Sequence, residues 1–266
     1  MKKPKNKENP RKYGKPPFNV AVLHGGPGAP GEMAPVAREL SCSWGVLEPL
    51  QTAASLEGQV QELQRILEEN GDLPMVLIGW SWGAILGFIL TARYPSLIKK
   101  LIIVGSAVFD KKYVAQITET RLSRFSDKER SEALDLMRKL SDPDTADKDT
   151  IMCRFGELIS KADSYSPVSC KSEILECQFN VFEYVWKDAE RLRDSGKLLK
   201  LGAQIKCPVV ALHGDYDPHP AEGVREPLSG VLKDFRFILL KKCGHHPWIE
   251  RMAREKYYQI LREELR

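Results

Sequence analysis

The sequence predicts an α/β fold: a mostly parallel sheet flanked by helices, with a helical segment inserted near its middle. Short apolar runs alternate with segments of helical period over residues 18–106, only helical periods follow over 107–200, and the alternation resumes over 201–266. Strands that form continuous apolar runs are typical of a parallel sheet covered on both faces. We therefore expect a core at 18–106 and 201–266, a helical insertion at 107–200 and a separate tail at 1–17.

The first part of the core is expected to contain four strands and three helices. The strands are residues 18–23, 45–50, 74–78 and 101–104, and the helices are 31–40, 56–70 and 82–94. Ser55 precedes the helical period of the second helix and is a favoured N-cap residue, while Gly71 follows its last turn. Pro95 ends the third helix.

The insertion shows helical periods separated by turn segments at 141–148 (SDPDTADK) and 164–167. After it, strands are expected at 208–212 and 235–240, and a last amphipathic helix carries Ile249, Tyr257 and Leu261. The expected sheet therefore has about six strands.

The chain's formal net charge of +4 is concentrated at its start. Residues 1–15 contain seven Lys or Arg and one Glu, a balance of +6, so the remainder carries −2. Such a tail is typical of solvated, disordered chain, and contact with nucleic acid or an anionic membrane is the alternative. No apolar segment of signal-peptide or membrane-span length follows it. We expect a soluble cytoplasmic protein, with neither nucleic acid nor membrane as a partner.

Six cysteines are present, at positions 42, 153, 170, 177, 207 and 243, without a close-set metal pattern. Cys170 and Cys177 are seven residues apart and have no histidine nearby. In a cytoplasmic chain this usage indicates reduced thiols rather than a disulfide or zinc site. The sequence implies no metal and no organic cofactor.

The pentapeptide GWSWG at 79–83 lies between an expected strand and an expected helix. In this setting G-x-S-x-G forms a nucleophile elbow, where glycines relieve crowding around a serine at a tight corner. The alternative is a turn that happens to contain a hydroxyl. A catalytic Ser81 needs a base, and the base needs an acid to orient it.

Both partners can be found at later strand ends. His245 follows the strand at 235–240 and is the expected base, with His246 as its rival. HGDYDPHP follows the strand at 208–212, and Asp217 lies farther out on that loop than Asp215, which we expect to make a local turn. The chain order Ser81, Asp217, His245 is that of nucleophile-elbow hydrolases.

HGGPG at 24–28 follows the first strand of the core. Its glycines allow a close approach of the backbone to a ligand, so the N–H groups of Gly26 and Trp82 are the expected oxyanion hole. The alternative is a simple proline-glycine turn. A phosphate-binding loop is disfavoured, because neither G-x-G-x-x-G nor Gly-Lys-Ser/Thr is present.

HGGPG, GWSWG, HGDYD and GHHPW, in this order, resemble the α/β-hydrolase superfamily, and HGGPG with Ser-Trp-Gly looks most like its proline iminopeptidase branch. The resemblance implies that the insertion is a cap domain over the active site. An epoxide hydrolase or a haloalkane dehalogenase would carry an aspartate at position 81. The family usually has two antiparallel strands before the HG loop, but only about 17 largely charged residues precede it here, so we expect that pair to be missing.

The expected reaction is cleavage of an ester or amide bond in a small, partly apolar substrate, with prolyl aminopeptidase as the alternative and a non-catalytic binding protein as a further one. Iminopeptidases hold a free amine with cap carboxylates. Glu173, Glu176 and Glu183 are candidates here, beside the aromatic residues Phe179, Phe182, Tyr184 and Trp186. Glu183 and Trp186 are the expected substrate contacts, although the helical spacing of Phe179, Phe182 and Trp186 is more typical of core or cap-to-domain packing. A small molecule or short peptide is the expected partner, and the oligomeric state is not predicted.

Overall fold

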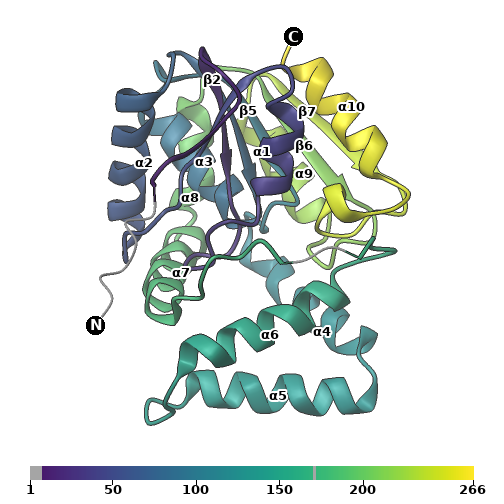
Figure 1. Cartoon of the computed structure of the whole chain (residues 1–266). Coiled ribbons are helices and arrows are strands. Elements are labelled where there is room, and N and C mark those ends of the chain that lie inside the picture. The colour runs from purple at the N-terminus through teal and green to yellow at the C-terminus, as the bar shows by residue number, and fades with distance from the viewer. Residues whose placement is uncertain (1–7, 170–171) are drawn as a thin grey trace.

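A computed structural model describes residues 8–169 and 172–266 and contains a central sheet covered by helices on both faces (Figure 1). The strands are β1 Arg11–Tyr13, β2 Phe18–Leu23, β3 Gly45–Glu48, β4 Met75–Trp80, β5 Ile98–Val104, β6 Val209–Gly214 and β7 Phe235–Leu240. Within the described residues they form a seven-stranded sheet in the order β1-β3-β2-β4-β5-β6-β7. All neighbouring strands are parallel except β1 and β3. This arrangement confirms the predicted α/β-hydrolase fold.

Strand β1 corrects two expectations about the start of the chain. We expected disordered tail up to residue 17 and neither of the two antiparallel strands. Instead, Arg11–Tyr13 pairs antiparallel with β3. Glu48 of β3 is fully buried and binds both Arg11 (2.6 Å) and the hydroxyl of Tyr13 (2.8 Å). A buried carboxylate needs such partners, so polar contacts rather than an apolar run hold this edge strand. Residues 1–7 of the expected tail lie outside the described residues.

The helices are α1 Ala34–Leu40, α2 Leu56–Asn70, α3 Trp82–Arg93, α4 Val114–Arg124, α5 Asp127–Ser141, α6 Lys148–Ala162, α7 Phe179–Asp194, α8 Lys197–Lys200, α9 Glu222–Val231 and α10 Arg254–Glu264. Short 3₁₀ turns occur at Lys111–Tyr113, Leu201–Gln204 and Pro247–Ile249. The Ser55 hydroxyl caps α2 by accepting the Gly58 N–H at 3.1 Å, as its position predicts. In the described ranges, none of the helices has the length and apolar character needed to span a bilayer.

The sheet separates two hydrophobic cores, one on each of its faces, and the apolar side chains of the strands contribute to both. Alternate residues of β2 illustrate this: Ala21 and Leu23 join the core beneath α2, α3 and α9, whereas Val20 and Val22 join the core beneath α1 and α10. Burial on both faces explains why residues 20–23 of β2 form a continuous apolar run.

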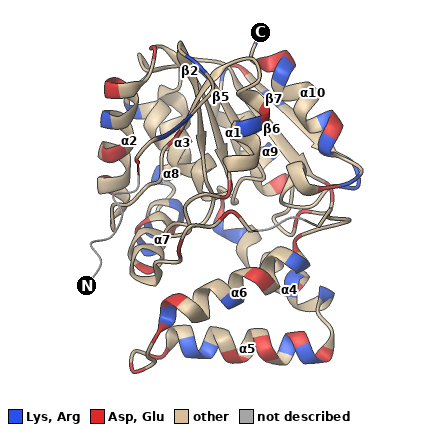
Figure 2. Cartoon of the chain, in the orientation of Figure 1, with Lys and Arg blue, Asp and Glu red and all other residues tan. Residues whose placement is uncertain are grey.

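Helices α4, α5 and α6 lie apart from the sheet and carry charges of both signs (Figures 1 and 2). They enclose a small cluster of their own, built on residues such as Phe125, Leu136 and Leu158. Helix α7 differs, because its Val181 and Val185 belong to the core beneath α2 and α3. Leu198 of α8 belongs to the same core. The predicted helical insertion therefore contains one group of helices that stands off the core, α4 to α6, and two helices that pack on it, α7 and α8.

A disulfide joins Cys153 of α6 to Cys177, just before α7. The expectation that all six cysteines are reduced is wrong for this pair, because folding brings together two positions 24 residues apart in sequence. Cys42, Cys207 and Cys243 are free, and Cys170 falls outside the described residues.

Candidate active site

The predicted site residues follow the carboxyl ends of neighbouring parallel strands. Gly26 follows β2, Ser81 follows β4, Asp217 follows β6 and His245 follows β7. Since the carboxyl ends of parallel strands meet at one edge of a sheet, the loops that carry these residues converge.

Ser81 sits at a strained corner between β4 and α3. Its φ of 52° and ψ of −112° lie in a region that residues with a side chain seldom adopt, and such strain is typical of functional sites. The flanking glycines make the corner possible: a Cβ on Gly79 would lie 2.2 Å from the carbonyl oxygen of Gly83, and one on Gly83 would lie 2.5 Å from that of Leu23. The strand–turn–helix geometry predicted for GWSWG is therefore present.

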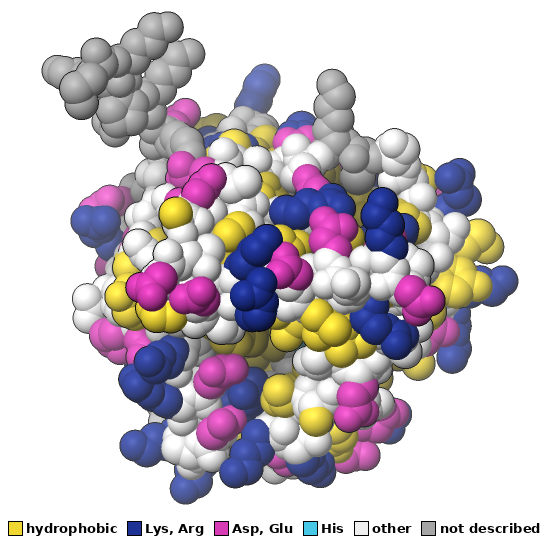
Figure 3. Space-filling view, turned by 90° about the horizontal axis from the view of Figure 1, so that it is seen from below, with side chains coloured by type: hydrophobic (Ala, Val, Ile, Leu, Met, Phe, Trp, Pro, Cys, Tyr) yellow, Lys and Arg dark blue, Asp and Glu magenta, His cyan; other side chains and the backbone are white. Residues whose placement is uncertain are grey.

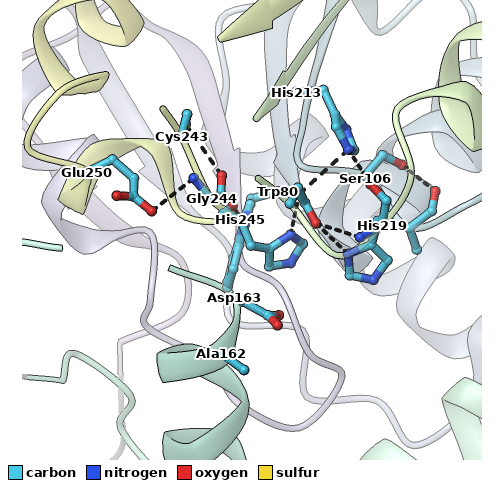
Figure 4. A network of polar contacts seen from close by, with 12 residues as sticks. Trp80, Ser106, Ala162, Asp163, His213, His219, Cys243, Gly244, His245 and Glu250 are labelled. Carbon is cyan, nitrogen blue, oxygen red and sulfur yellow. Dashed lines mark hydrogen bonds and ion pairs between the residues drawn. The ribbon is translucent and has the colours of Figure 1, made fainter. Parts of the chain in front are cut away.

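Asp217 and His245 are in direct contact. Nδ1 of His245 lies 2.7 Å from Oδ2 of Asp217, and the two side chains are almost completely buried. The indole N–H of Trp80, the residue before Ser81, donates to the backbone carbonyl of His245 at 2.8 Å (Figure 4). The loop that carries the histidine is thus tied directly to the nucleophile elbow.

The rival residues take other positions. His246 packs its ring against Trp80 and Trp248, and its Nδ1 has no hydrogen-bond partner in the described structure. Burial and the neighbouring His245 lower the pKa of His246 to about 3. Asp215 accepts the backbone N–H of Cys243, 28 positions away, at 3.2 Å, so its carboxylate contacts the histidine loop instead of making the local turn expected for it. Of the four candidates, only His245 and Asp217 bond to each other.

Two further histidines, to which no role was predicted, lie beside Asp217. His219 donates its backbone N–H (2.9 Å) and its Nδ1–H (2.8 Å) to Oδ1 of Asp217, and its ring stacks on that of His245 with centroids 4.7 Å apart. His213 places Nε2 3.8 Å from Oδ2. His219 stands two residues after Asp217 in HGDYDPHP, so that motif contained the signal for it.

These contacts set the charges of the buried group. Burial alone would raise the pKa of Asp217, but His245, His213 and His219 outweigh it and hold that pKa well below its usual range. Burial lowers the pKa of His245, yet the Asp217 carboxylate reverses the effect and leaves it above 6.5. Burial dominates at His219 and lowers its pKa to about 4. At pH 7 Asp217 is therefore an anion that accepts from a neutral His219.

Asp217, His219 and His245 also form a group of possible metal-ligating side chains, with one ligand atom from each lying within 4.8 Å of the others. Imidazole and carboxylate suit zinc. The Nδ1 atoms of both histidines, however, are engaged with Asp217, so a metal at Nδ1 would displace these hydrogen bonds.

The two residues expected to form the oxyanion hole follow two adjacent strands of the sheet: Gly26 follows β2 and Trp82 follows β4. Trp82 opens α3, where the first N–H groups of a helix have no partner within it. Its side chain is buried, and the indole N–H donates to Gln59 at 2.9 Å. Gly26 has a φ of 35°, and the preceding Gly25 packs so closely on the Trp80 ring that a Cβ there would lie 2.4 Å from it.

Arg121 of α4 and Asp163, the C-cap residue of α6, form a salt bridge beside the histidine, with Nε–Oδ1 and Nη2–Oδ2 distances of 2.8 and 2.6 Å. Asp163 is buried, and its backbone carbonyl accepts the N–H of His245 at 2.8 Å. Neither residue belongs to a recognisable motif, because the contact depends on how the inserted helices fold back. The insertion therefore contacts the candidate site through Arg121 of α4 and the C-terminal end of α6.

Glu183 and Trp186 do not gather with the other candidates. Glu183 is exposed and lines a cavity of about 540 Å³ together with residues of the α5–α6 connection, such as Pro143 and Asp147. Ser81, Asp217 and His245 do not line this cavity. Trp186 packs against the core, with its ring edge-on to that of Trp82 at 6.3 Å, so its helical spacing is explained by packing.

On the molecular surface seen from the side of the insertion, charged side chains of both signs are interspersed with apolar side chains (Figure 3).

Glu32, in the segment between the HGGPG loop and α1, is a carboxylate for which no role was predicted. It is partly buried, and in the part of the chain described here it makes no hydrogen bond or ion pair. Burial raises its pKa to about 7, against an opposing influence of His245. A carboxylate with a perturbed pKa and electrostatic coupling to His245 is a candidate functional group.

Comparison with known proteins agrees with this arrangement. Among solved structures, VinJ aligns with a TM-score of 0.66 at 17% identity, covering 96% of this chain and 93% of VinJ. A monoacylglycerol lipase from Paleococcus ferrophilus gives 0.62 at 18% identity, covering 96% and 97% of the two chains. Proline iminopeptidase from Mycobacterium smegmatis gives 0.62 at 16% identity, covering 96% and 93%. No curated protein matches the sequence.

Structural likeness at these identities speaks for the fold. The sequence itself also identifies the family, because residues 38–251, most of the chain, match a family model described as alpha/beta hydrolase fold. That range contains the elbow serine, the buried Asp217 and His245. This chain belongs to the α/β-hydrolase fold family.

Proposed function

We propose that this protein is a serine hydrolase that cleaves an ester or amide bond through a Ser81–His245–Asp217 triad. The observation that carries the proposal is the 2.7 Å contact between His245 and Asp217, on a loop bonded to Trp80 beside the strained Ser81. An ionised Asp217 fixes the proton of His245 on Nδ1, which leaves Nε2 free to act as a base.

In the proposed reaction, Ser81 Oγ attacks the substrate carbonyl carbon while His245 Nε2 takes the hydroxyl proton. The N–H groups of Gly26 and Trp82 hold the oxyanion, and His245 returns the proton to the departing alcohol or amine. Water then attacks the acyl-enzyme with His245 as its base, which releases the acid and restores the serine. The substrate is a small, partly apolar molecule.

Two measurements test this function together. A fluorophosphonate probe is expected to label wild-type protein once, at Ser81, because only an activated serine reacts rapidly with it. A panel of p-nitrophenyl esters of increasing chain length is expected to be hydrolysed, with a preference for the short chains. Protein that is neither labelled nor active on any ester would instead support a non-catalytic binding role.

Glu32 favours a second candidate, prolyl aminopeptidase. A substrate with a free amine requires an anion near the scissile bond. Glu32 is coupled electrostatically to His245 and has no ion-pair partner among the described residues. The other carboxylates considered are less available: Glu173 pairs with Arg38 at 2.6 Å, and Glu183 is exposed at a cavity that the triad does not line.

Glu32→Gln separates the two substrate classes. If Glu32 binds an amine, this variant is expected to lower kcat/KM for proline and alanine p-nitroanilides by at least about 30-fold, because a buried charge loses its partner. Hydrolysis of p-nitrophenyl acetate, which has no amine, is the internal control and should change less than about 3-fold. The measurement belongs at pH 8, where a carboxyl group with a pKa of about 7 is ionised. Equal losses on both substrates, or no loss on anilides, would rule out an amine subsite at Glu32.

A further inference from the structure

Glu250 is a buried carboxylate outside the proposed triad. It is 0% exposed and follows the turn Pro247–Ile249. Its Oε1 accepts the backbone N–H groups of Gly244 (2.9 Å) and Tyr165 (2.7 Å), and its Oε2 accepts that of Ser166 (2.7 Å). Charge-assisted bonds of this kind are among the strongest in proteins. Figure 4 shows the contact with Gly244. One side chain thereby joins the residue before His245 to the segment that leaves α6.

The two segments are tightly interlocked around this carboxylate. The backbone of the segment after α6 pairs with that of the segment after His245: the Val168 N–H donates to Ile249 at 2.8 Å, and the Arg251 N–H donates to Ser166 at 3.0 Å. Gly244 allows the approach, because a Cβ there would lie 2.1 Å from the carbonyl oxygen of Asp163 and 2.6 Å from Oε1 of Glu250. The position of the histidine loop therefore depends on the segment that follows α6 within the insertion.

The backbone of His245 is bound from both sides within this unit. Its N–H donates to Asp163, whose side chain pairs with Arg121 of α4, and its carbonyl accepts from Trp80. The bond to Trp80 fixes the loop to the nucleophile elbow, and the bond to Asp163 fixes it to the inserted helices. Glu250 adds a third connection, because its carboxylate binds Gly244 of the histidine loop and also Tyr165 and Ser166 of the segment after α6.

We propose that Glu250 is a positioning residue that holds His245 in register with Asp217 by bonding the histidine loop to the segment leaving α6. The proposal rests on the proposed function, in which His245 is the base. Glu250 touches neither substrate nor reacting atoms. It acts through the backbone of Gly244, whose displacement would move the imidazole away from Asp217.

A purely stabilising role predicts a different result from a positioning role. Loss of stability alone lowers the melting temperature and leaves the pH profile of the folded enzyme unchanged. Displacement of His245 weakens its bond to Asp217, and because that carboxylate raises the pKa of His245, the pKa falls. The acid limb of kcat/KM then moves to lower pH. Misplacement of a reacting group by about 1 Å can cost about 100-fold in rate.

The test compares Glu250→Gln with Glu250→Asp and with Glu255→Gln, an exposed position on α10. Glutamine turns an NH₂ group toward backbone donors, and aspartate keeps the charge but is one methylene too short to reach all three. Both Glu250 variants are expected to lower kcat for p-nitrophenyl acetate by about 10- to 100-fold, with a smaller change in KM and a lower acid limb. Glu255→Gln should match the wild type. In an Asp217→Asn background Glu250→Gln should not shift the acid limb further, because the bond through which it acts is already lost.

The results decide whether Glu250 positions His245. Folded Glu250 variants with wild-type kcat and acid limb would overturn the proposal, as would failure of both variants to fold, which would assign Glu250 to stability. A shift of the acid limb that persists in the Asp217→Asn background would point to the charge of Glu250 rather than to positioning, and would also overturn it. Wild-type protein that shows neither ester turnover nor fluorophosphonate labelling would contradict the proposed function itself.

Discussion

Replacing Ser81 with alanine is expected to lower kcat/KM for p-nitrophenyl acetate by at least about 10⁴-fold and to abolish fluorophosphonate labelling. Alanine removes the oxygen that would form the acyl-enzyme. His245, Asp217 and the backbone N–H groups of the proposed oxyanion hole stay in place, so any remaining activity measures what they achieve without a nucleophile. Initial rates and mass spectrometry of probe-treated protein give the two readouts.

The Ser81 variant should remain folded. The Ser81 side chain makes no capping hydrogen bond to α3, and alanine carries the same Cβ into the φ of 52° that the corner requires. Its melting temperature is therefore expected to stay close to that of the wild type, and Ser96→Ala, at an exposed position, is the matched control. Substantial turnover by folded Ser81→Ala would show that another group is the nucleophile and would exclude the proposed mechanism.

The core of the fold could be predicted from sequence because its signals are local. Strands β2 and β7 have the bounds that their apolar runs indicate, and α2 begins after the predicted N-cap Ser55. GWSWG was informative for the same reason, since a glycine on each side of the serine, a strand before it and a helix after it all lie within a few residues.

Strand β1 and the disulfide could not be predicted in this way. Arg11 and Tyr13 are held by Glu48, which lies 35 or more residues away, so a short charged segment gives no local sign that it will enter a sheet. Cys153 and Cys177 meet only after α6 and the segment before α7 have packed together. Spacing along the chain contains neither relationship.

The same difference between local signals and contacts of distant residues applies to the candidate site. The rule that loops at the carboxyl edge of a parallel sheet converge was enough to choose Ser81, Asp217 and His245 as candidates. Asp163 contacts the histidine loop only through the fold of the insertion, and the bonds of Glu250 to Tyr165 and Ser166 depend on that fold too; no periodicity or motif indicates these contacts. Glu183 and Trp186 were chosen because the resemblance implies a cap carboxylate and because they lie in an aromatic cluster. Neither reason distinguishes a substrate contact from surface exposure or core packing.

Asp217→Asn is expected to reduce kcat by about 10⁴-fold while leaving Ser81 in place. Three N–H groups point at this carboxylate: Nδ1–H of His245, and the backbone N–H and Nδ1–H of His219. An amide offers one acceptor oxygen and one NH₂ group, so in either orientation NH₂ meets a donor. Where NH₂ faces His245, the imidazole must move its proton to Nε2, and it can no longer accept the proton of Ser81.

The pH profile gives this prediction a second, independent readout. His245 must be neutral to act as a base, and Asp217 raises its pKa above 6.5, so wild-type kcat/KM should fall as the pH drops through that raised value. Without the carboxylate, the effect of burial predominates and lowers the pKa, so the acid limb of Asp217→Asn should lie at lower pH. Asp215→Asn is the control, because Asp215 lies on the same loop as Asp217 but bonds to Cys243 and not to His245. An Asp217→Asn enzyme with wild-type kcat, or with an acid limb that has not moved, would mean that Asp217 does not orient the base.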